Sequence, residues 1–383
     1  MQVEPADPTP SEHAPESSSA KPARRNWVRR LTHWTLSTVM ALVVIGLLLG
    51  CCVFSAPTYE GPVGPHFDGE HFFNPGDPST NESRWGAFLR WRMSRDLGPW
   101  EEWVEGTIGA PAKRRNGRGE LHVQFINHST CLIQMGGLNI LTDPVWSERV
   151  SPVSFAGPAR RRAPGVPFED LPPIDAVLIS HNHYDHLDVP TLQRLSRDHR
   201  PRFFAGLGVR AYLEQQGIER SEDLDWWGHA DLGEDVRVTF VPARHFSGRG
   251  LCDRNGTLWG GFVVAGPGGP VYFAGDTGFG DHFAEIRERL GRPRLALLPI
   301  GAFRPRDFMG PIHIDPAEAV RAHQVLGAGT SMGIHFGTFV LADDGRLEPV
   351  EELQKVLSGM AVPRPRFWAL RQGELRSVPP LDE

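Results

Sequence analysis

Three histidines and two aspartates lie close together in residues 180–188, the segment SHNHYDHLD. Imidazole nitrogens and carboxylate oxygens are the ligands that proteins offer to zinc and to other divalent metals of similar softness. If the extended backbone of the preceding apolar run continues, His181 and His183 point to the same side, because side chains alternate along a strand. A turn after them would bring Asp185 and His186 toward a second metal ion. The segment is therefore predicted to contribute ligands to two metal ions.

One segment cannot complete two metal sites, so further ligands must come from other parts of the chain. Three candidates follow or lie within apolar runs: His245 after VRVTFVPAR, Asp276 after VYFAG, and His335 within MGIHFG. Taken alone, Asp276 would be an ordinary turn residue. Several segments of one form, each with a ligand at or near the end of a strand, favour a metal centre instead.

In this order, the HNHYDH segment, the His245 segment, AGDTGF and the His335 segment resemble the metallo-β-lactamase superfamily. Longer segments are similar to one branch of it, the N-acylphosphatidylethanolamine-hydrolysing phospholipase D enzymes and their bacterial relatives. These segments are LTDPVWSERVSPVSFAGPARR, SHNHYDHLD, AGDTGF, LLPIGAFRPRDFM, HIDPAEAVRAH and HFGTF. The resemblance covers roughly residues 83–376. It implies a four-layer αββα sandwich with a dinuclear metal site, usually zinc, at one edge of the sheets.

The resemblance also implies a role for each candidate residue. The first of two zinc ions would be held by His181, His183 and His245, and the second by Asp185, His186 and His335, with Asp276 bridging both. Asp143, in the TDP segment, would lie behind the ligands, where a carboxylate orients a ligating imidazole. His313 matches a histidine that the branch places in its active site, where it would contact the substrate phosphate or assist the leaving group. The candidate catalytic residues are Asp185, Asp276 and His313.

Two divalent ions ~3.5–4 Å apart can share a hydroxide that attacks phosphorus, and they can screen charge on the phosphoryl oxygens. Ligands that are all His and Asp suit zinc and leave iron or manganese open. We therefore expect a zinc-dependent phosphodiesterase of phospholipase D type that cleaves N-acylphosphatidylethanolamine-like lipids to N-acylethanolamine and phosphatidate. Two alternatives stay open. One is a lactonase or phosphodiesterase of the same fold that acts on a small soluble substrate, and the other is a catalytically silent, metal-binding envelope protein.

A lipid substrate needs an apolar approach to the metals. The candidates that flank the motifs are Trp146, Val150, Val153, Phe155, Phe303, Phe308 and Met309, for each of which ordinary packing is the alternative. The run Arg160-Arg161-Arg162 would attract anionic headgroups, although such runs are usually solvated surface.

The elements that must position these residues belong to a chain of 383 residues with 42 Gly and 34 Pro, a composition that favours a loop-rich α/β or β architecture. Short apolar runs between turn residues predict strands at 121–129, 131–136, 138–144, 175–180, 202–206, 236–243, 258–266, 271–276, 294–300 and 332–337. Helices are predicted at 190–198, 208–216, 281–290, 316–326 and 348–358, with Asp315 as an N-cap, and a helix and a turn within 83–105.

Residues 36–54 run 19 positions without a charge after a basic stretch, and a bilayer span needs ~20 apolar residues. The segment is predicted to be a retained membrane anchor, a cleaved signal peptide, or a lipoprotein signal ending at Cys51. The basic flank places the N-terminus in the cytoplasm and the catalytic domain on the extracytoplasmic (periplasmic) side. The expected organisation is a disordered basic N-terminus (1–33), the apolar segment (34–55), a linker (56–82), the hydrolase domain (83–376) and a tail (377–383). The linker is expected to pack on the domain through Phe67, Phe72 and Phe73.

The formal charge of −6 argues against nucleic acid as a partner, because dedicated binders carry a basic excess. The expected partners are a phospholipid or other phosphodiester substrate and the membrane, with a homodimer left open. The chain has four Cys, of which Cys51 and Cys52 are adjacent, and Cys131 and Cys252 are a pair that could form a disulfide in principle.

Overall fold

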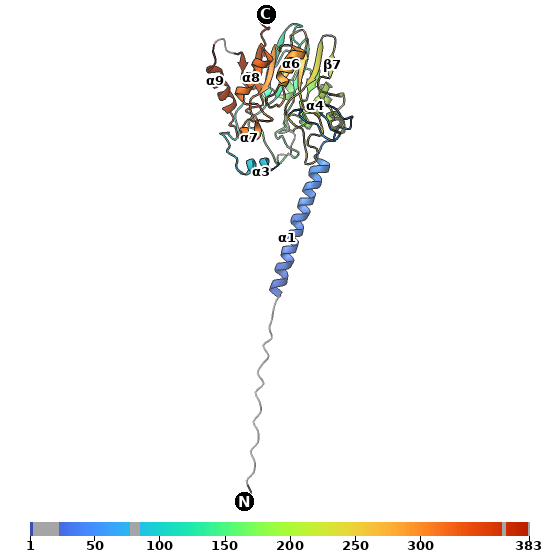
Figure 1. Cartoon of the computed structure of the whole chain (residues 1–383), viewed down its shortest axis with the longest axis vertical. Coiled ribbons are helices and arrows are strands. Elements are labelled where there is room, and N and C mark those ends of the chain that lie inside the picture. Colours follow the sequence, from blue (N-terminus) through green and yellow to red (C-terminus); the bar gives the residue numbers. More distant parts are fainter. Residues whose placement is uncertain (3–22, 77–84, 362–364, 382–383) are drawn as a thin grey trace. The chain divides into compact units, whose positions relative to one another are not determined.

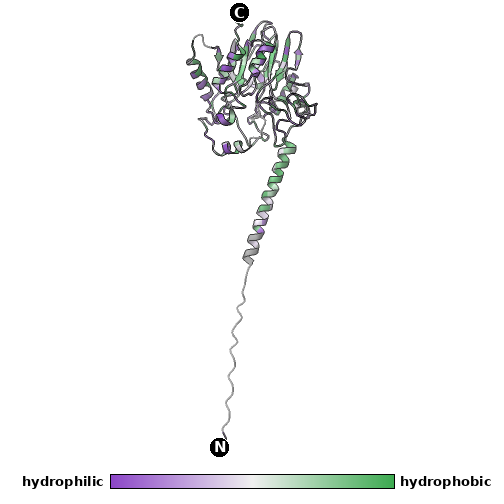
Figure 2. Cartoon of the chain, in the orientation of Figure 1, coloured by the Kyte–Doolittle hydropathy of each residue, from purple (hydrophilic) through white to green (hydrophobic). Residues whose placement is uncertain are grey.

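The computed structural model describes residues 1–2, 23–76, 85–361 and 365–381, and the chain divides into two compact units, residues 1–49 and 50–383. In the first unit, helix α1 covers Ala23–Leu48. Residues 23–33, predicted to be disordered, form the beginning of this helix, whereas most of the predicted disordered segment, residues 3–22, lies outside the described residues. The stretch Arg30–Val53 is long and apolar enough to cross a membrane, a test that a signal sequence near the N-terminus also passes (Figure 2).

The second unit is built on two seven-stranded sheets (Figure 1). The first has the order β14-β1-β2-β3-β4-β5-β6 and the second the order β13-β12-β11-β10-β9-β8-β7. The strands of the first sheet are β1 (Leu121–Asn127), β2 (Thr130–Met135), β3 (Leu138–Thr142), β4 (Ala176–Leu178), β5 (Arg202–Gly206), β6 (Ser221–Leu224) and β14 (Leu375–Ser377). Those of the second sheet are β7 (His229–Leu232), β8 (Val236–Val241), β9 (Gly261–Ala265), β10 (Val271–Phe273), β11 (Leu295–Pro299), β12 (Thr330–Ile334) and β13 (Phe367–Trp368).

Each sheet changes from antiparallel to parallel pairing near its middle. In the first sheet β14 and β1–β3 pair antiparallel and β3–β6 pair parallel. In the second sheet β7–β10 pair antiparallel and β10–β13 pair parallel. The carboxyl ends of neighbouring parallel strands therefore meet at one edge of each sheet, which is where open sheets with helical crossovers place their sites.

Apolar side chains form three layers of core. The inward faces of both sheets pack on one another, with Phe125 and Phe204 from the first sheet and Phe240, Phe262 and Phe273 from the second. The outer face of the first sheet packs against α4 (Val189–Asp198) and α5 (Val209–Gln215). The outer face of the second packs against α6 (His282–Leu290), α8 (Pro316–Leu326) and α9 (Glu348–Ser358). The predicted four-layer αββα sandwich is confirmed.

Helices α4, α5, α6, α8 and α9 lie within a residue or two of their predicted positions. Helix α8 begins with a capping box, in which the Asp315 carboxylate accepts the Glu318 backbone N–H and the Glu318 carboxylate accepts the Asp315 N–H. The remaining helical elements are η1 (Leu49–Val53), α3 (Trp85–Met93), η2 (Phe168–Asp170) and α7 (Arg306–Met309). Strands β6, β7, β13 and β14 were not predicted, because they are two to four residues long and lack an apolar run.

The segment that precedes the sandwich is part of its core. Phe67 and Phe72 are buried among the inward-facing residues of the two sheets, as expected, whereas Phe73 is only half-buried. Cys252 forms a disulfide with Cys51, so the pairing with Cys131 considered from the sequence is wrong. Cys131 is buried in β2, where sheet pairing keeps it from a distant loop, and its thiol is free.

Candidate metal centre

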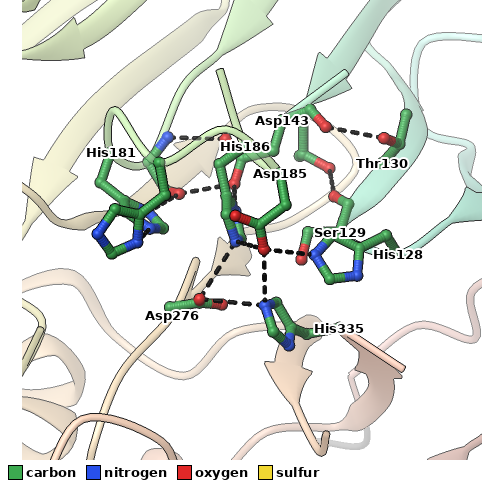
Figure 3. Close-up of polar contacts among 12 residues, drawn as sticks. His128, Ser129, Thr130, Asp143, His181, Asp185, His186, Asp276 and His335 are labelled. Atoms are coloured by element: carbon green, nitrogen blue, oxygen red, sulfur yellow. Dashed lines mark hydrogen bonds and ion pairs between the residues drawn. The ribbon is translucent and has the colours of Figure 1, made fainter. Parts of the chain in front are cut away.

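Three ligand candidates, Asp185, His186 and His335, lie close to a fourth, Asp276 (Figure 3). They follow the strands β4, β10 and β12. His186 Nε2 lies 3.1 Å from Asp276 Oδ2 and 3.2 Å from Asp185 Oδ2. His335 Nε2 lies 3.1 Å from Asp276 Oδ2 and 3.4 Å from Asp185 Oδ2. Two imidazoles and two carboxylates thus face one small volume, which we call the carboxylate set.

Three histidines form a neighbouring cluster, which we call the histidine set. His181 Nε2 lies 2.8 Å from His183 Nδ1, and His245 Nε2 lies 3.4 Å from the same atom. His181 and His183 follow β4, which ends at Leu178, and His245 follows β8 in the other sheet. The three donor atoms lie within 4.8 Å of one another.

Asp276 lies close to both sets. It also groups with His181 and His186, and with His245 and His313. Its Oδ2 is 3.8 Å from His245 Nε2 and 4.0 Å from His313 Nδ1. Gly275 makes this approach possible, because its φ is +61° and a Cβ there would lie 2.5 Å from the Ser180 Cβ. The structure therefore brings together all the metal ligands predicted from the sequence, with His313 beside them.

Hydrogen bonds fix the orientation of the ligand imidazoles. Asp143 is fully buried, and its Oδ2 lies 2.6 Å from His186 Nδ1 and 2.6 Å from the Ser180 hydroxyl, while its Oδ1 accepts the Ser180 N–H. His245 Nδ1 lies 3.0 Å from the Ile312 carbonyl, to which only an N–H can donate. In both imidazoles Nδ1 carries the proton for this hydrogen bond, so Nε2 is the atom left for a metal. Asp143 thus lies behind the ligands, where it was predicted.

Burial keeps the histidine set neutral. It lowers the pKa of His183 to about 4 and holds the pKa values of His181 and His245 well below the usual range. The His313 pKa is lowered to about 4 for the same reason. At neutral pH these imidazoles have a free nitrogen lone pair, which is the form that binds a metal.

The carboxylate set has the opposite electrostatics. Burial would lower the pKa of His335, but Asp276 and Asp185 outweigh it and raise that pKa to about 9. The pKa of His186 is raised well above its usual value by Asp276, Asp185 and Asp143, again against burial. The same contacts hold the pKa values of both carboxylates well below the usual range, although burial opposes them. In the metal-free chain, protons on the imidazoles therefore balance the buried carboxylates.

The residues fit a pair of divalent cations. A Zn–N or Zn–O bond of ~2.0–2.2 Å places neighbouring ligand atoms about as far apart as the contacts measured within each set. His181 Nε2 and His183 Nδ1 lie 2.8 Å apart, so in the metal-free chain one of them donates a hydrogen bond to the other, and a cation between them would take the place of that proton. Asp276 Oδ1 and His335 Nδ1 are buried without a hydrogen-bond partner.

His128 is a site residue that sequence reasoning missed. Its Nε2 lies 3.0 Å from Asp185 Oδ2, and its carbonyl accepts the N–H of His335. Together with Asp185, His186 and His335 it forms one group of possible metal ligands. The signal was present, because His128 follows the apolar run of β1 just as the other candidates follow theirs. Burial lowers its pKa to about 3, so it acts as a neutral donor to the carboxylate.

Three residues of the site have a strained backbone. Asp143, His128 and His335 have φ values of +33°, +46° and +60°, a region that residues with a Cβ rarely adopt. Such conformations persist only where the surroundings hold them, and they cluster at functional sites.

The predicted apolar rim is wrong for three of its seven residues. Val150, Phe303 and Met309 are buried in local clusters or beside them, and Trp146, Val153 and Phe308 are half-buried. Only Phe155 is well exposed, at 82%. Arg160 is also buried, and it donates to the carbonyls of Ser147 and Val145, so this part of the arginine run supports a loop and does not face solvent.

Residues 138–336 match a family model described as the β-lactamase superfamily domain. The chain belongs to the metallo-β-lactamase superfamily and has the fold of its metallo-hydrolases.

Two relatives extend the match beyond this domain. An uncharacterized protein of Mycobacterium tuberculosis is 37% identical over 88% of this chain and 88% of its own length. The N-acyl-phosphatidylethanolamine-hydrolyzing phospholipase D 1 of Caenorhabditis elegans is 39% identical over 62% of this chain and 70% of its own length. Among solved structures, an isothiocyanate hydrolase from Delia radicum gut bacteria superposes with a TM-score of 0.52. It is 21% identical and covers 67% of this chain and 98% of that one, a likeness of fold alone.

Proposed function

We propose that this chain is a zinc-dependent phosphodiesterase of phospholipase D type that hydrolyses N-acylphosphatidylethanolamine-like lipids. One zinc ion would be held by the histidine set and one by the carboxylate set, with Asp276 shared between them. The observation that carries the proposal is the Asp276 carboxylate between two sets of candidate ligands that are buried or half-buried. The similarity to the phospholipase D of Caenorhabditis elegans supports the substrate class. Two such ions would supply a nucleophile at neutral pH and neutralise charge on a phosphodiester.

The protein's own residues would orient these parts. Asp143 keeps His186 in the tautomer whose Nε2 faces the site. His128 Nε2 donates a hydrogen bond to the Asp185 carboxylate and so fixes its position. His313 has a buried Nδ1 without a hydrogen-bond partner, 4.0 Å from Asp276 Oδ2. That nitrogen is available for a hydrogen bond to a phosphoryl oxygen or to the leaving group.

We also propose that α1 is a retained membrane anchor and that the catalytic domain lies on the extracytoplasmic side. The Cys51–Cys252 disulfide supports this side, because disulfides persist in oxidising compartments. A lipoprotein signal would need the Cys51 sulfur for a lipid, so the disulfide at Cys51 favours the anchor over that alternative. In bacterial spheroplasts that express the chain, externally added protease should remove the domain. Protection of the domain until the membrane is lysed would overturn the proposed side.

The activity is tested by product analysis with the full chain in detergent micelles. The zinc-loaded protein is incubated with N-acylphosphatidylethanolamine, and the products are identified by mass spectrometry beside an Asp276→Ala control. Release of N-acylethanolamine and phosphatidate by the unmodified chain alone is the expected result. If two metal ions are bound and neither product forms, the phospholipase activity is wrong, and lactones and soluble phosphodiesters are the next substrates to assay.

A further inference from the structure

The side chain of Arg249 closes the loop that carries most of the ligands. This metal loop, residues 181–188, joins β4 to α4. Arg249 Nη1 donates to the Asn182 carbonyl at 2.8 Å and to the Leu187 carbonyl at 2.9 Å. These two carbonyls lie on either side of residues 183–186. A single cationic group therefore holds together the two ends of the segment that contributes His183, Asp185 and His186.

Aromatic rings hold the same guanidinium from its faces. Its central carbon lies 4.0 Å from the ring centroid of Tyr184, within the metal loop, and 4.9 Å from that of Tyr212 on α5. Stacking on Tyr184 leaves the edge of the planar group free for the two carbonyls. Tyr184, which offers no candidate metal ligand, thus has a definite partner.

The backbone around Arg249 is held in turn. The Asp253 carboxylate accepts the N–H groups of Arg249, Gly250 and Ala56. The neighbouring Cys252 is bound covalently to Cys51. Gly248, next to Arg249, donates its N–H to the Asn182 side chain at 2.7 Å. Arg249 therefore reaches the metal loop from a fixed base and not from a free surface loop.

We propose that Arg249 is a positioning residue for the metal centre, which sets the spacing of His183, Asp185 and His186 by tying together the ends of the metal loop. The inference rests on the proposed metal centre. The Arg249 guanidinium donates to backbone carbonyls beside the ligands, so Arg249 acts on the metal centre through the loop. Groups that orient metal ligands from behind are worth ~10–100-fold in metal affinity.

The test compares Arg249→Leu and Arg249→Lys with a matched control, Arg194→Leu. The guanidinium of Arg194, on α4, also stacks on an aromatic ring, 3.9 Å from the Phe168 centroid, and it pairs at the surface with Glu169 of η2. Zinc affinity is measured on the full-length chain by competition with a chelator. The coordination geometry is measured from the visible absorption of the cobalt-substituted protein.

Arg249→Leu is expected to lower zinc affinity ~10–100-fold and to change the cobalt spectrum, with Arg194→Leu matching the unmodified chain. Arg249→Lys is expected to recover part of the loss, because an ammonium can reach a carbonyl but cannot stack flat and bridge two of them. Unmodified affinity and an unmodified cobalt spectrum in Arg249→Leu would overturn the positioning role. An unmodified chain that binds no metal would instead overturn the metal centre itself.

Hydrogen exchange keeps the test decisive if Arg249→Leu does not fold. In Tyr184→Leu the guanidinium loses its closest stacking partner, while all backbone donations remain available. The amides of residues 183–187 are then expected to exchange faster in the metal-free protein, with the amides of β4 and α4 unchanged. Equal exchange in the unmodified and variant chains would contradict the proposed role of the stacked guanidinium.

Discussion

The histidine set and the carboxylate set share Asp276 and differ in charge. The first brings three imidazoles whose pKa values are lowered by burial, so it is neutral and ready for a cation at pH 7. The second brings two buried carboxylates that raise the pKa values of His186 and His335. A metal ion at the histidine set adds charge to a neutral pocket, whereas one at the carboxylate set replaces protons. Two sets that draw ligands from the same loop can therefore differ in how their metal affinity responds to pH.

The largest effect is expected from Asp276→Ala, which removes the carboxylate that both sets share. Metal content should fall from about two ions per chain to less than one, and activity should be lost while the sheets stay folded. Elemental analysis and circular dichroism measure the two outcomes. Retention of both ions would show that the two sets are independent of Asp276.

Asp185→Asn should separate the two sets. The change removes a charge from the carboxylate set alone, so about one ion per chain should remain, held by the histidine set. Elemental analysis again measures the result, with Asp198→Asn on the surface of α4 as the control. Loss of both ions would mean that the histidine set cannot hold a metal without its neighbour.

A smaller effect is expected from Asp143→Asn, which keeps the shape but removes the acceptor charge behind His186. The affinity of the carboxylate set should drop ~10–100-fold, with the histidine set unchanged, because the ligand imidazole loses its orienting partner. A two-step zinc titration against a chelator resolves the two affinities. An equal drop at both sets would contradict the assignment of Asp143 to one of them.

The smallest effect is expected from a change of one pH unit without any substitution. His335, with a pKa of about 9, is protonated at pH 7.5 in the metal-free chain and must release its proton to bind a metal. The affinity of the carboxylate set should therefore rise by ~tenfold per pH unit for each proton released, up to about pH 9. The histidine set, with the His183 pKa at about 4, should show no such rise above pH 6. Calorimetry in buffers of different ionisation enthalpy counts the protons released when each metal ion binds. Equal proton release at both sets would contradict the proposed difference in their charge.

Much of the sandwich could be predicted, because its signals are local. Apolar runs between turn residues marked the longer strands, and Asp315 with Pro316 marked the start of α8. The short edge strands could not be predicted, since two to four residues of ordinary composition become a strand only by pairing with a neighbour. The buried members of the predicted apolar rim, Val150, Phe303 and Met309, were misplaced for a related reason, because an apolar side chain in a loop has the same sequence signal whether it is buried or exposed.

Which histidines and aspartates follow the strands, and that these residues suit a divalent metal, could be read from the sequence alone. The resemblance to a known superfamily sorted these candidate ligands into two sets. The folded chain was needed to show that Asp276 lies between the sets, that His128 reaches Asp185, that Cys51 pairs with Cys252 and that Arg249 closes the metal loop. The physical reason is distance along the chain. Local patterns specify strands, turns and caps, but contacts between residues far apart in sequence depend on how two sheets pack and where their strands end.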